Sequence, residues 1–214
     1  QNPYSVGLSK VIEEEFPKRG GTIVAKENYA SGNQDFQSQL TNIRAANPQI
    51  VFLPGYYTEV VKILPQARKL GITCPFIGGD GWDSSTTIPQ GGEAVNGCYF
   101  SDHYAPDDPN PRVQDFVKKF KAQYNGEVPD AMAVLGYDAA NILFAAIERA
   151  GSTEGPKIRD SLAETKDFPG VTGNITIGPD RNAVKPGVML KIEDGKLKMV
   201  ARVGEMAASA PAGH

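Results

Sequence analysis

The 214-residue sequence has few residues of the kinds that build metal centres and disulfide frameworks, with two cysteines, two histidines and one tryptophan. Cys74 and Cys98 each lie at the edge of an apolar run. On neighbouring strands they could form a disulfide, or they could be two small buried hydrophobic residues. His103 and His214 are too few and too far from any cysteine cluster to suggest a metal site. We therefore expect neither a metal nor a cofactor.

Neither sign of charge dominates, because 22 basic and 25 acidic side chains give a net charge of −3. No basic stripe interleaved with aromatic residues is present, which argues against a nucleic-acid partner. The sequence also lacks a Ser/His/Asp set, a Cys/His pair and a phosphate-loop pattern, so we expect no enzymatic activity. No apolar run approaches the roughly 20 residues of a membrane span, and the first residue resembles a processed or truncated end.

The first hundred residues alternate between helical and strand patterns. Helices are predicted at 3–16, 35–46 and 58–70, the last with a kink or break at Pro65, and strands at 22–26, 49–53, 75–77 and 98–101. This alternation favours right-handed β-α-β crossovers, and thus an α/β fold with a mostly parallel, doubly wound sheet.

Two turns rich in glycine and aromatic residues, 54–57 and 79–82, follow consecutive predicted strands. In doubly wound sheets, ligands bind beyond the carboxyl ends of the strands. A carboxylate inside such a turn repels phosphate and attracts a cation, and the Trp82 indole next to Asp80 offers a face to the same cation. The turn therefore predicts an ammonium site. The alternatives are a surface turn in which Asp80 caps the next segment, and the phosphate turn of an α/β nucleotide-binding domain.

After residue 101 the pattern changes. A segment rich in proline and aspartate, 102–111, is typical of a crossover or hinge. Helices are then predicted at 111–124, 130–150 and 154–164, and strands at 171–177, 188–192 and 197–203, the last two joined by an Asp-Gly hairpin turn. The helix 130–150 is apolar on most sides and must be buried on more than one face. Residues 204–214 are expected to form a mobile tail.

Several motifs occur in a characteristic order: FLPGYYTE at 52–59, GGDGWD at 78–83 and AVLGYDAA at 133–140, with agreement at 99–111 and 168–173. With them, residues 1–203 resemble the branched-chain amino acid substrate-binding proteins of ABC transporters, the leucine/isoleucine/valine-binding family. The resemblance implies a type I periplasmic-binding-protein fold with two lobes. It also implies a solute-binding component of an ABC importer, either periplasmic or lipid-anchored. Such a protein binds an aliphatic amino acid in the cleft between its lobes, catalyses no reaction, and presents the ligand to the transporter permease. A sensory ligand-binding domain of a receptor is the main alternative.

The resemblance implies roles for individual residues. Asp80 matches the acidic ligand of the α-ammonium group, Tyr4 and Tyr56 match aromatic positions that line the cleft, and Tyr137 matches an aromatic residue near the ligand side chain. Tyr4 and Tyr137 also fit simple packing roles. Gly79 and Trp82 are added from the local chemistry of the turn. Many relatives carry Glu at the position of Asp80, so the preferred amino acid stays open.

The resemblance also implies a division of the chain. Residues 1–101 would form lobe 2 without its first strand, 102–185 a partial lobe 1, 186–203 a return to lobe 2, and 204–214 a flexible tail. Hinges are expected near 102–105 and 185–188. About a third of a family member, including the groups that receive the α-carboxylate, would be missing at the N-terminus. We therefore expect a fragment with half of a site, whose exposed apolar surface meets the missing segment or a second copy.

Overall fold

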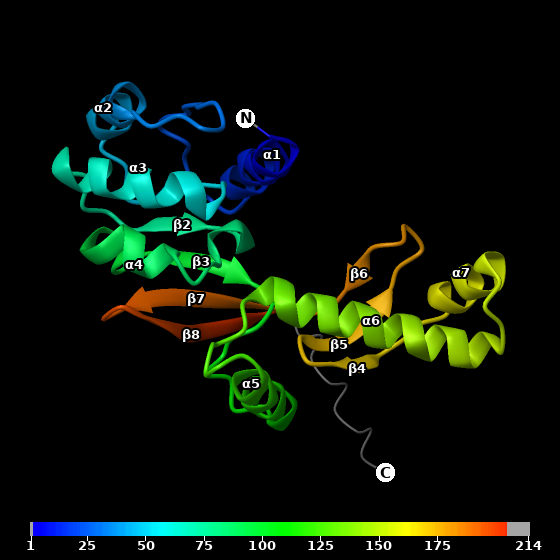
Figure 1. Cartoon of the computed structure of the whole chain (residues 1–214). Helices are drawn as coiled ribbons and strands as arrows, with labels where there is room; N and C mark the ends of the chain where they lie inside the picture. The colour runs from blue at the N-terminus through cyan, green and yellow to red at the C-terminus, as the bar shows by residue number, and fades with distance from the viewer. Residues whose placement is uncertain (1, 205–214) are drawn as a thin grey trace, which may run out of the picture. The chain divides into compact units, whose positions relative to one another are not determined.

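The computed structural model of the chain describes residues 2–204 (Figure 1). It divides into two compact units. Unit 1 contains the residues up to Ser101 together with Leu190–Lys198, and unit 2 contains Asp102–Met189 and the described residues from Met199 onward. The return to unit 1 is thus shorter than the expected 186–203. The expected tail lies outside the described residues except for Gly204.

Unit 1 alternates helices and strands in the order the sequence predicts. Asn2 caps its first helix by accepting a hydrogen bond from the Ser5 N–H, and that helix continues through Pro17, past its predicted end. The third helix also runs through Pro65 without a break. The elements are α1 (Pro3–Lys18), α2 (Gln37–Ala45), β1 (Val51–Phe52), α3 (Tyr57–Lys69), β2 (Phe76–Gly78), η1 (Asp80–Trp82), α4 (Thr87–Gly91), η2 (Gly92–Val95) and β3 (Tyr99–Asp102).

A five-stranded sheet has the order β1-β2-β3-β7-β8, where β7 is Gly187–Glu193 and β8 is Lys196–Val203. The pairs β1–β2 and β2–β3 are parallel, which confirms the predicted parallel sheet. The Asp-Gly hairpin between β7 and β8 is also confirmed, because Asp194 and Gly195 both have positive φ, at 52° and 68°. The chain passes between the units three times, within β3, β7 and β8.

The predicted strand at 22–26 is wrong, because these residues belong to no strand in the structure. The sheet begins with β1, so the segment has no neighbour in the sheet order. Ile23 and Val24 are 40% and 55% exposed. Local β-propensity predicted the strand, but propensity forms no ladder without a partner strand.

Unit 2 is built on helices and a small antiparallel sheet. Its elements are α5 (Pro111–Gln123), α6 (Ala131–Ala150), α7 (Gly155–Ala163), β4 (Phe168–Gly170), β5 (Gly173–Ile177) and β6 (Ala183–Val184). Helix α7 packs against α6, and the two lie side by side in Figure 1. The continuous strand predicted at 171–177 is wrong at its start: β4 and β5 form an antiparallel pair across a turn at 171–172, and Gly173, the first residue after this turn, has a φ of 115°.

Helix α6 carries apolar side chains on most of its surface, as the sequence predicts, but the expectation that more than one face is buried is wrong in the structure of unit 2. One face is buried in unit 2, through Ala131, Val134, Asp138, Ile142 and Ala146. The other exposes large apolar side chains: Met132, Tyr137, Leu143 and Phe144. Among the described residues, α6 alone is long and apolar enough to cross a membrane, a match by length and composition that core helices also reach. The expectation that no apolar run approaches that length is therefore corrected.

Both cysteines are free thiols, so the structure contains no disulfide between Cys74 and Cys98. Cys98 is buried, and Cys74 is partly buried. The Arg68 guanidinium donates a hydrogen bond to the Cys74 carbonyl at 2.9 Å and lies 3.5 Å from Cys98 Sγ. Burial raises the pKa of both thiols, which keeps them protonated at neutral pH.

Candidate functional site

A tyrosine hydroxyl and an aspartate carboxylate, 76 residues apart in sequence, meet in unit 1. The Tyr4 hydroxyl donates a hydrogen bond to Asp80 Oδ1 at 2.7 Å and accepts one from the Gly81 N–H at 3.0 Å. Burial raises the pKa of Tyr4 well above its ordinary value; Asp80 adds to the rise and the Gly81 N–H opposes it. Tyr4 therefore stays protonated at neutral pH and remains a donor to Asp80.

The parallel strands bring a second tyrosine to the same place. Tyr56 follows β1 and Asp80 follows β2, so both lie at the carboxyl edge of two neighbouring strands. The Tyr56 ring stacks on the Tyr4 ring with centroids 5.1 Å apart and planes at 27°. Tyr56 is exposed, whereas Tyr4 and Asp80 are half-buried. A half-exposed carboxylate beside two aromatic faces suits a cationic group such as an ammonium ion.

The glycines of the turn are required by close packing around these side chains. A Cβ atom on Gly79 would lie 2.5 Å from the Tyr4 hydroxyl oxygen, and one on Gly81 would lie 2.6 Å from the Gly55 carbonyl oxygen. A Cβ on Gly78 would lie 2.2 Å from the Trp82 indole. The space beside each glycine is therefore filled by protein. This filling, together with the carboxylate, argues against the phosphate-binding alternative.

Trp82 lies in the core of unit 1 and is 0% exposed. Its indole N–H donates a hydrogen bond to the Leu53 carbonyl at 3.1 Å, and its ring centroid lies 6.2 Å from that of Phe100. An enclosed ring offers no open face to a ligand, so the prediction of Trp82 as a ligand contact is corrected. Its position instead ties η1 to the end of β1.

Tyr137 lies on α6 in unit 2, and its side chain is 50% exposed. Its ring centroid lies 4.9 Å from that of Phe116, and its carbonyl accepts a hydrogen bond from Asn141. With Phe120 and Tyr124 it lines a groove of about 680 Å³ between α5 and α6. These contacts are all within unit 2. A role of Tyr137 beside a ligand remains a prediction.

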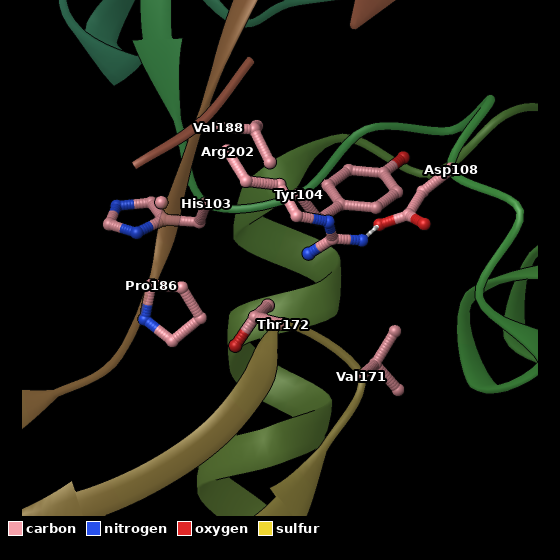
Figure 2. A pocket seen from close by; sticks show the side chains of 9 residues that line it. His103, Tyr104, Asp108, Val171, Thr172, Pro186, Val188 and Arg202 are labelled. Atoms are coloured by element: carbon pink, nitrogen blue, oxygen red, sulfur yellow. Dashed lines mark hydrogen bonds and ion pairs between the residues drawn. The ribbon is translucent and has the colours of Figure 1, made fainter. Parts of the chain in front are cut away.

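Figure 2 shows a much smaller cavity in unit 2, at residues from the two expected hinge segments. His103, Tyr104, Pro186 and Val188 line it, and Arg202 donates to the buried Asp108 carboxylate, which also lines it. Its volume of about 10 Å³ is close to the space of one water molecule, far below that of an amino acid. We therefore assign no ligand to it.

The expected hinge segments are also joined by a partly buried ammonium group. Lys185 donates hydrogen bonds to the Pro186 carbonyl at 3.1 Å and to the His103 carbonyl at 3.4 Å. Burial lowers the pKa of Lys185, although Asp138 and Asp102 oppose this. These bonds order the two segments within unit 2.

The sequence did not reveal two residues that lie behind the Tyr56 turn. The Tyr29 hydroxyl lies against Gly55, because a Cβ atom there would be 2.3 Å from it. Glu59 is buried at the start of α3 and accepts hydrogen bonds from the Gly32 N–H at 3.0 Å and from the Thr58 hydroxyl. A glutamate near the start of a predicted helix was a usable signal in the sequence, but nothing in the sequence connects Tyr29 to Gly55.

Comparison with known proteins gives consistent matches. A profile of the family described as "Periplasmic binding protein" matches residues 1–196. Among curated proteins, the chain is similar to Leu/Ile/Val-binding protein homolog 3 of Brucella melitensis, with 27% identity over 198 residues that cover 91% of the chain and 52% of the relative. The chain thus spans about half the length of the curated relatives it matches.

Two solved structures are also similar. The leucine-binding protein LivK of Thermotoga maritima has a TM-score of 0.90 and 38% identity, covering 95% of this chain and 58% of that one. LivJ of Streptococcus pneumoniae, a branched-chain amino acid transporter substrate-binding protein in complex with isoleucine, has a TM-score of 0.84 and 33% identity, with coverages of 94% and 56%. These likenesses confirm the predicted type I periplasmic-binding-protein fold.

Proposed function

Because the chain belongs to the periplasmic binding protein family, we propose that it takes part in binding a branched-chain amino acid, with Asp80 receiving the ligand's ammonium group. The family consists of binding proteins, so no reaction is assigned. The observation that carries the proposal is the Tyr4–Asp80 hydrogen bond beside the stacked Tyr56 ring. The Tyr4 hydroxyl donates to one oxygen of this carboxylate, Oδ1, and a carboxylate accepts hydrogen bonds at several positions.

The proposal is that this chain supplies only the ammonium end of the binding site. The site presents the Asp80 carboxylate, the Tyr4 hydroxyl and the rings of Tyr4 and Tyr56, which suit a cation and an apolar side chain. A ligand carboxylate would need donors such as backbone N–H groups or a basic side chain. The side chain of Tyr137 remains a candidate wall for the apolar part of the ligand.

Three molecules test this division: leucine, isoamylamine, which is leucine without its carboxylate, and 4-methylpentanoate, which is leucine without its amine. They would be titrated into ¹⁵N-labelled protein while the amide signals of Gly79, Asp80 and Gly81 are followed by NMR. We expect isoamylamine and leucine to bind with similar dissociation constants, because both present the same ammonium group, and 4-methylpentanoate to leave these signals unchanged.

Two results would contradict parts of the proposal. A response to 4-methylpentanoate alone, at these amides, would remove the ammonium role of Asp80. Leucine binding more than about tenfold tighter than isoamylamine would correspond to 1.4 kcal/mol from the carboxylate, and would contradict the half-site. A response to ATP in the same titration would favour the nucleotide-binding alternative.

The transporter partner and the cellular location are proposed from the family. We infer that the protein acts outside the inner membrane and presents its ligand to an ABC transporter permease. We also infer that the exposed apolar side chains of α6 associate with a second copy when the chain is produced by itself. Light scattering after size-exclusion chromatography tests this association, and a sharp monomer peak with cooperative unfolding would contradict it.

A further inference from the structure

Gly55 lies against the Tyr29 hydroxyl, which leaves no room for a side chain at this position. It is buried, and a Cβ atom on it would lie 2.3 Å from the Tyr29 hydroxyl oxygen. Its carbonyl oxygen lies close to Gly81, because a Cβ on Gly81 would be 2.6 Å from it. Gly55 does not have a positive φ, so alanine is allowed there by the backbone. The restriction at Gly55 is therefore steric, and the Tyr29 hydroxyl causes it.

Tyr29 is itself held in place. Its ring packs edge-on against the buried Phe36, with centroids 5.4 Å apart and planes at 88°. Burial and the nearby Glu59 carboxylate raise the pKa of Tyr29 to about 12, so its hydroxyl is neutral at physiological pH. A packed, neutral side chain of this kind can act as a fixed support for the backbone it touches.

The irregular segment that carries Tyr29 is fastened to α3. Glu59 accepts the Gly32 N–H, as described above, and Gln66 Oε1 accepts the Phe36 N–H at 2.9 Å. The Gln66 amide also donates to the Gln34 carbonyl at 2.9 Å. Tyr56 is the N-cap residue of the same helix. Helix α3 thus anchors both the support and the turn that it supports.

We propose that Tyr29 is a positioning residue for the ammonium site: its hydroxyl, pressed against Gly55, fixes the turn that keeps Tyr56 stacked on Tyr4 beside Asp80. This proposal rests on the proposed function, because it concerns the same site. Tyr29 acts through Gly55 and Tyr56, and its effect on the ligand is indirect. The segment 27–36, which forms no helix or strand, thereby acquires a defined role.

A pair of substitutions tests the contact in both directions. Gly55→Ala places a methyl group against the Tyr29 hydroxyl. We expect it to displace the turn and to raise the dissociation constant for isoamylamine about tenfold, the scale of a typical overpacking cost. In the Tyr29→Phe background the nearest atom of that ring to the methyl group is Cζ, at an ordinary 3.7 Å. The double variant should therefore return to within about twofold of Tyr29→Phe alone.

Amide chemical shifts of Gly79 and Gly81, recorded without ligand, provide a second readout. Gly55→Ala should move both signals, and adding Tyr29→Phe should restore them. Gly136→Ala is the matched control, because a Cβ there meets no atom within 4 Å. This control should leave these amides unmoved.

The outcomes are separable. If Gly55→Ala has no effect, or if its effect persists in the Tyr29→Phe background, the positioning role of Tyr29 is overturned. If Gly55→Ala fails to fold and the double variant folds, the contact is supported. If the unaltered protein does not respond to isoamylamine, the proposed function fails, while the ligand-free shifts still decide for or against the positioning role.

Discussion

The two units each contain an aspartate that is held by hydrogen bonds, and the two carboxylates differ in their surroundings. Asp138 on α6 is 2% exposed and accepts three hydrogen bonds, from the Val171 N–H at 2.8 Å, the Thr172 N–H at 2.9 Å and the Thr172 hydroxyl at 2.8 Å. Asp80 is half-buried and accepts a hydrogen bond from the Tyr4 hydroxyl. One carboxylate is enclosed by donors of its own unit, and the other reaches the surface.

This difference separates a structural role from a binding role. Backbone N–H groups that a buried carboxylate satisfies would be left without partners if it were removed, which makes Asp138 important for the stability of unit 2. Substituting a carboxylate that reaches solvent costs the protein less stability, because water already satisfies part of it. Such a carboxylate can also exchange that water for a cation. Both aspartates belong to motifs of the same family resemblance, so only their surroundings distinguish them.

The largest effect is expected for Asp138→Ala. Removing the carboxylate leaves the Val171 and Thr172 N–H groups buried without an acceptor, so we expect a loss of about 3 kcal/mol in the free energy of unfolding. Urea denaturation followed by circular dichroism measures it. Thr172→Val, which removes only the hydroxyl bond, should cost about 1 kcal/mol. Equal stability of Asp138→Ala and the unaltered protein would refute the structural role.

Asp80→Asn should show the opposite pattern. We expect isoamylamine binding to weaken on the order of a hundredfold, because an ammonium group loses its charge partner, while the free energy of unfolding changes by less than about 1 kcal/mol. Calorimetry and urea denaturation on the same sample give both values. Asp115→Asn, on the exposed surface of α5, removes an equal charge and should leave binding unchanged. A loss of stability without a loss of affinity would mean that Asp80, like Asp138, has a structural role and no binding role.

A smaller effect is expected for Tyr4→Phe. It removes the donor to Asp80 Oδ1 and the acceptor of the Gly81 N–H but keeps the ring that stacks on Tyr56. The net value of such a hydrogen bond is about 1 kcal/mol, so we expect isoamylamine affinity to fall about fivefold. Calorimetry measures the change. An unchanged affinity would mean that Tyr4 contributes through its ring alone.

The smallest effect concerns Glu59 and is visible as a dependence on pH. Burial, the largest single influence, raises its pKa, but hydrogen bonds from Thr58 and Gly32 and the charge of Lys62 outweigh it, so the net pKa is lowered from 4.5. The ionised Glu59 carboxylate therefore stabilises the folded protein fully above pH 4.5. This contribution to the free energy of unfolding is lost as the pH falls through the lower folded-state pKa.

We therefore expect Glu59→Gln to be about 1 kcal/mol less stable at neutral pH, with the difference shrinking in acid. Urea denaturation at several pH values measures this. Glu14→Gln, at an exposed position of α1, should show no such trend. A difference that grows as the pH falls would contradict the lowered pKa of Glu59.

The sequence predicted those parts of the fold and site that depend on local chemistry. Helical periodicity located the main helices. The Asp194-Gly195 pair predicted the hairpin turn, because both residues accept the positive φ that the turn requires. The predictions that were wrong concern residues whose structure depends on tertiary contacts with distant parts of the chain. The segment 22–26 has strand propensity but no partner strand, and the Trp82 indole, two residues after Asp80 in sequence, is buried in the core. The contact of Tyr29 with Gly55 depends on tertiary packing that no spacing reveals.

The triple passage of the chain between the units, described for β3, β7 and β8, has a consequence for proteolysis. A single cut in the irregular segment 103–110 would yield two polypeptides, one ending after β3 and the other containing β7 and β8. They would still be held together, because β3 and β7 are neighbours in one sheet and Ile192 exchanges backbone hydrogen bonds with Gly97 and Cys98. A nicked protein would thus migrate as two bands on a denaturing gel and elute as one species from a native column.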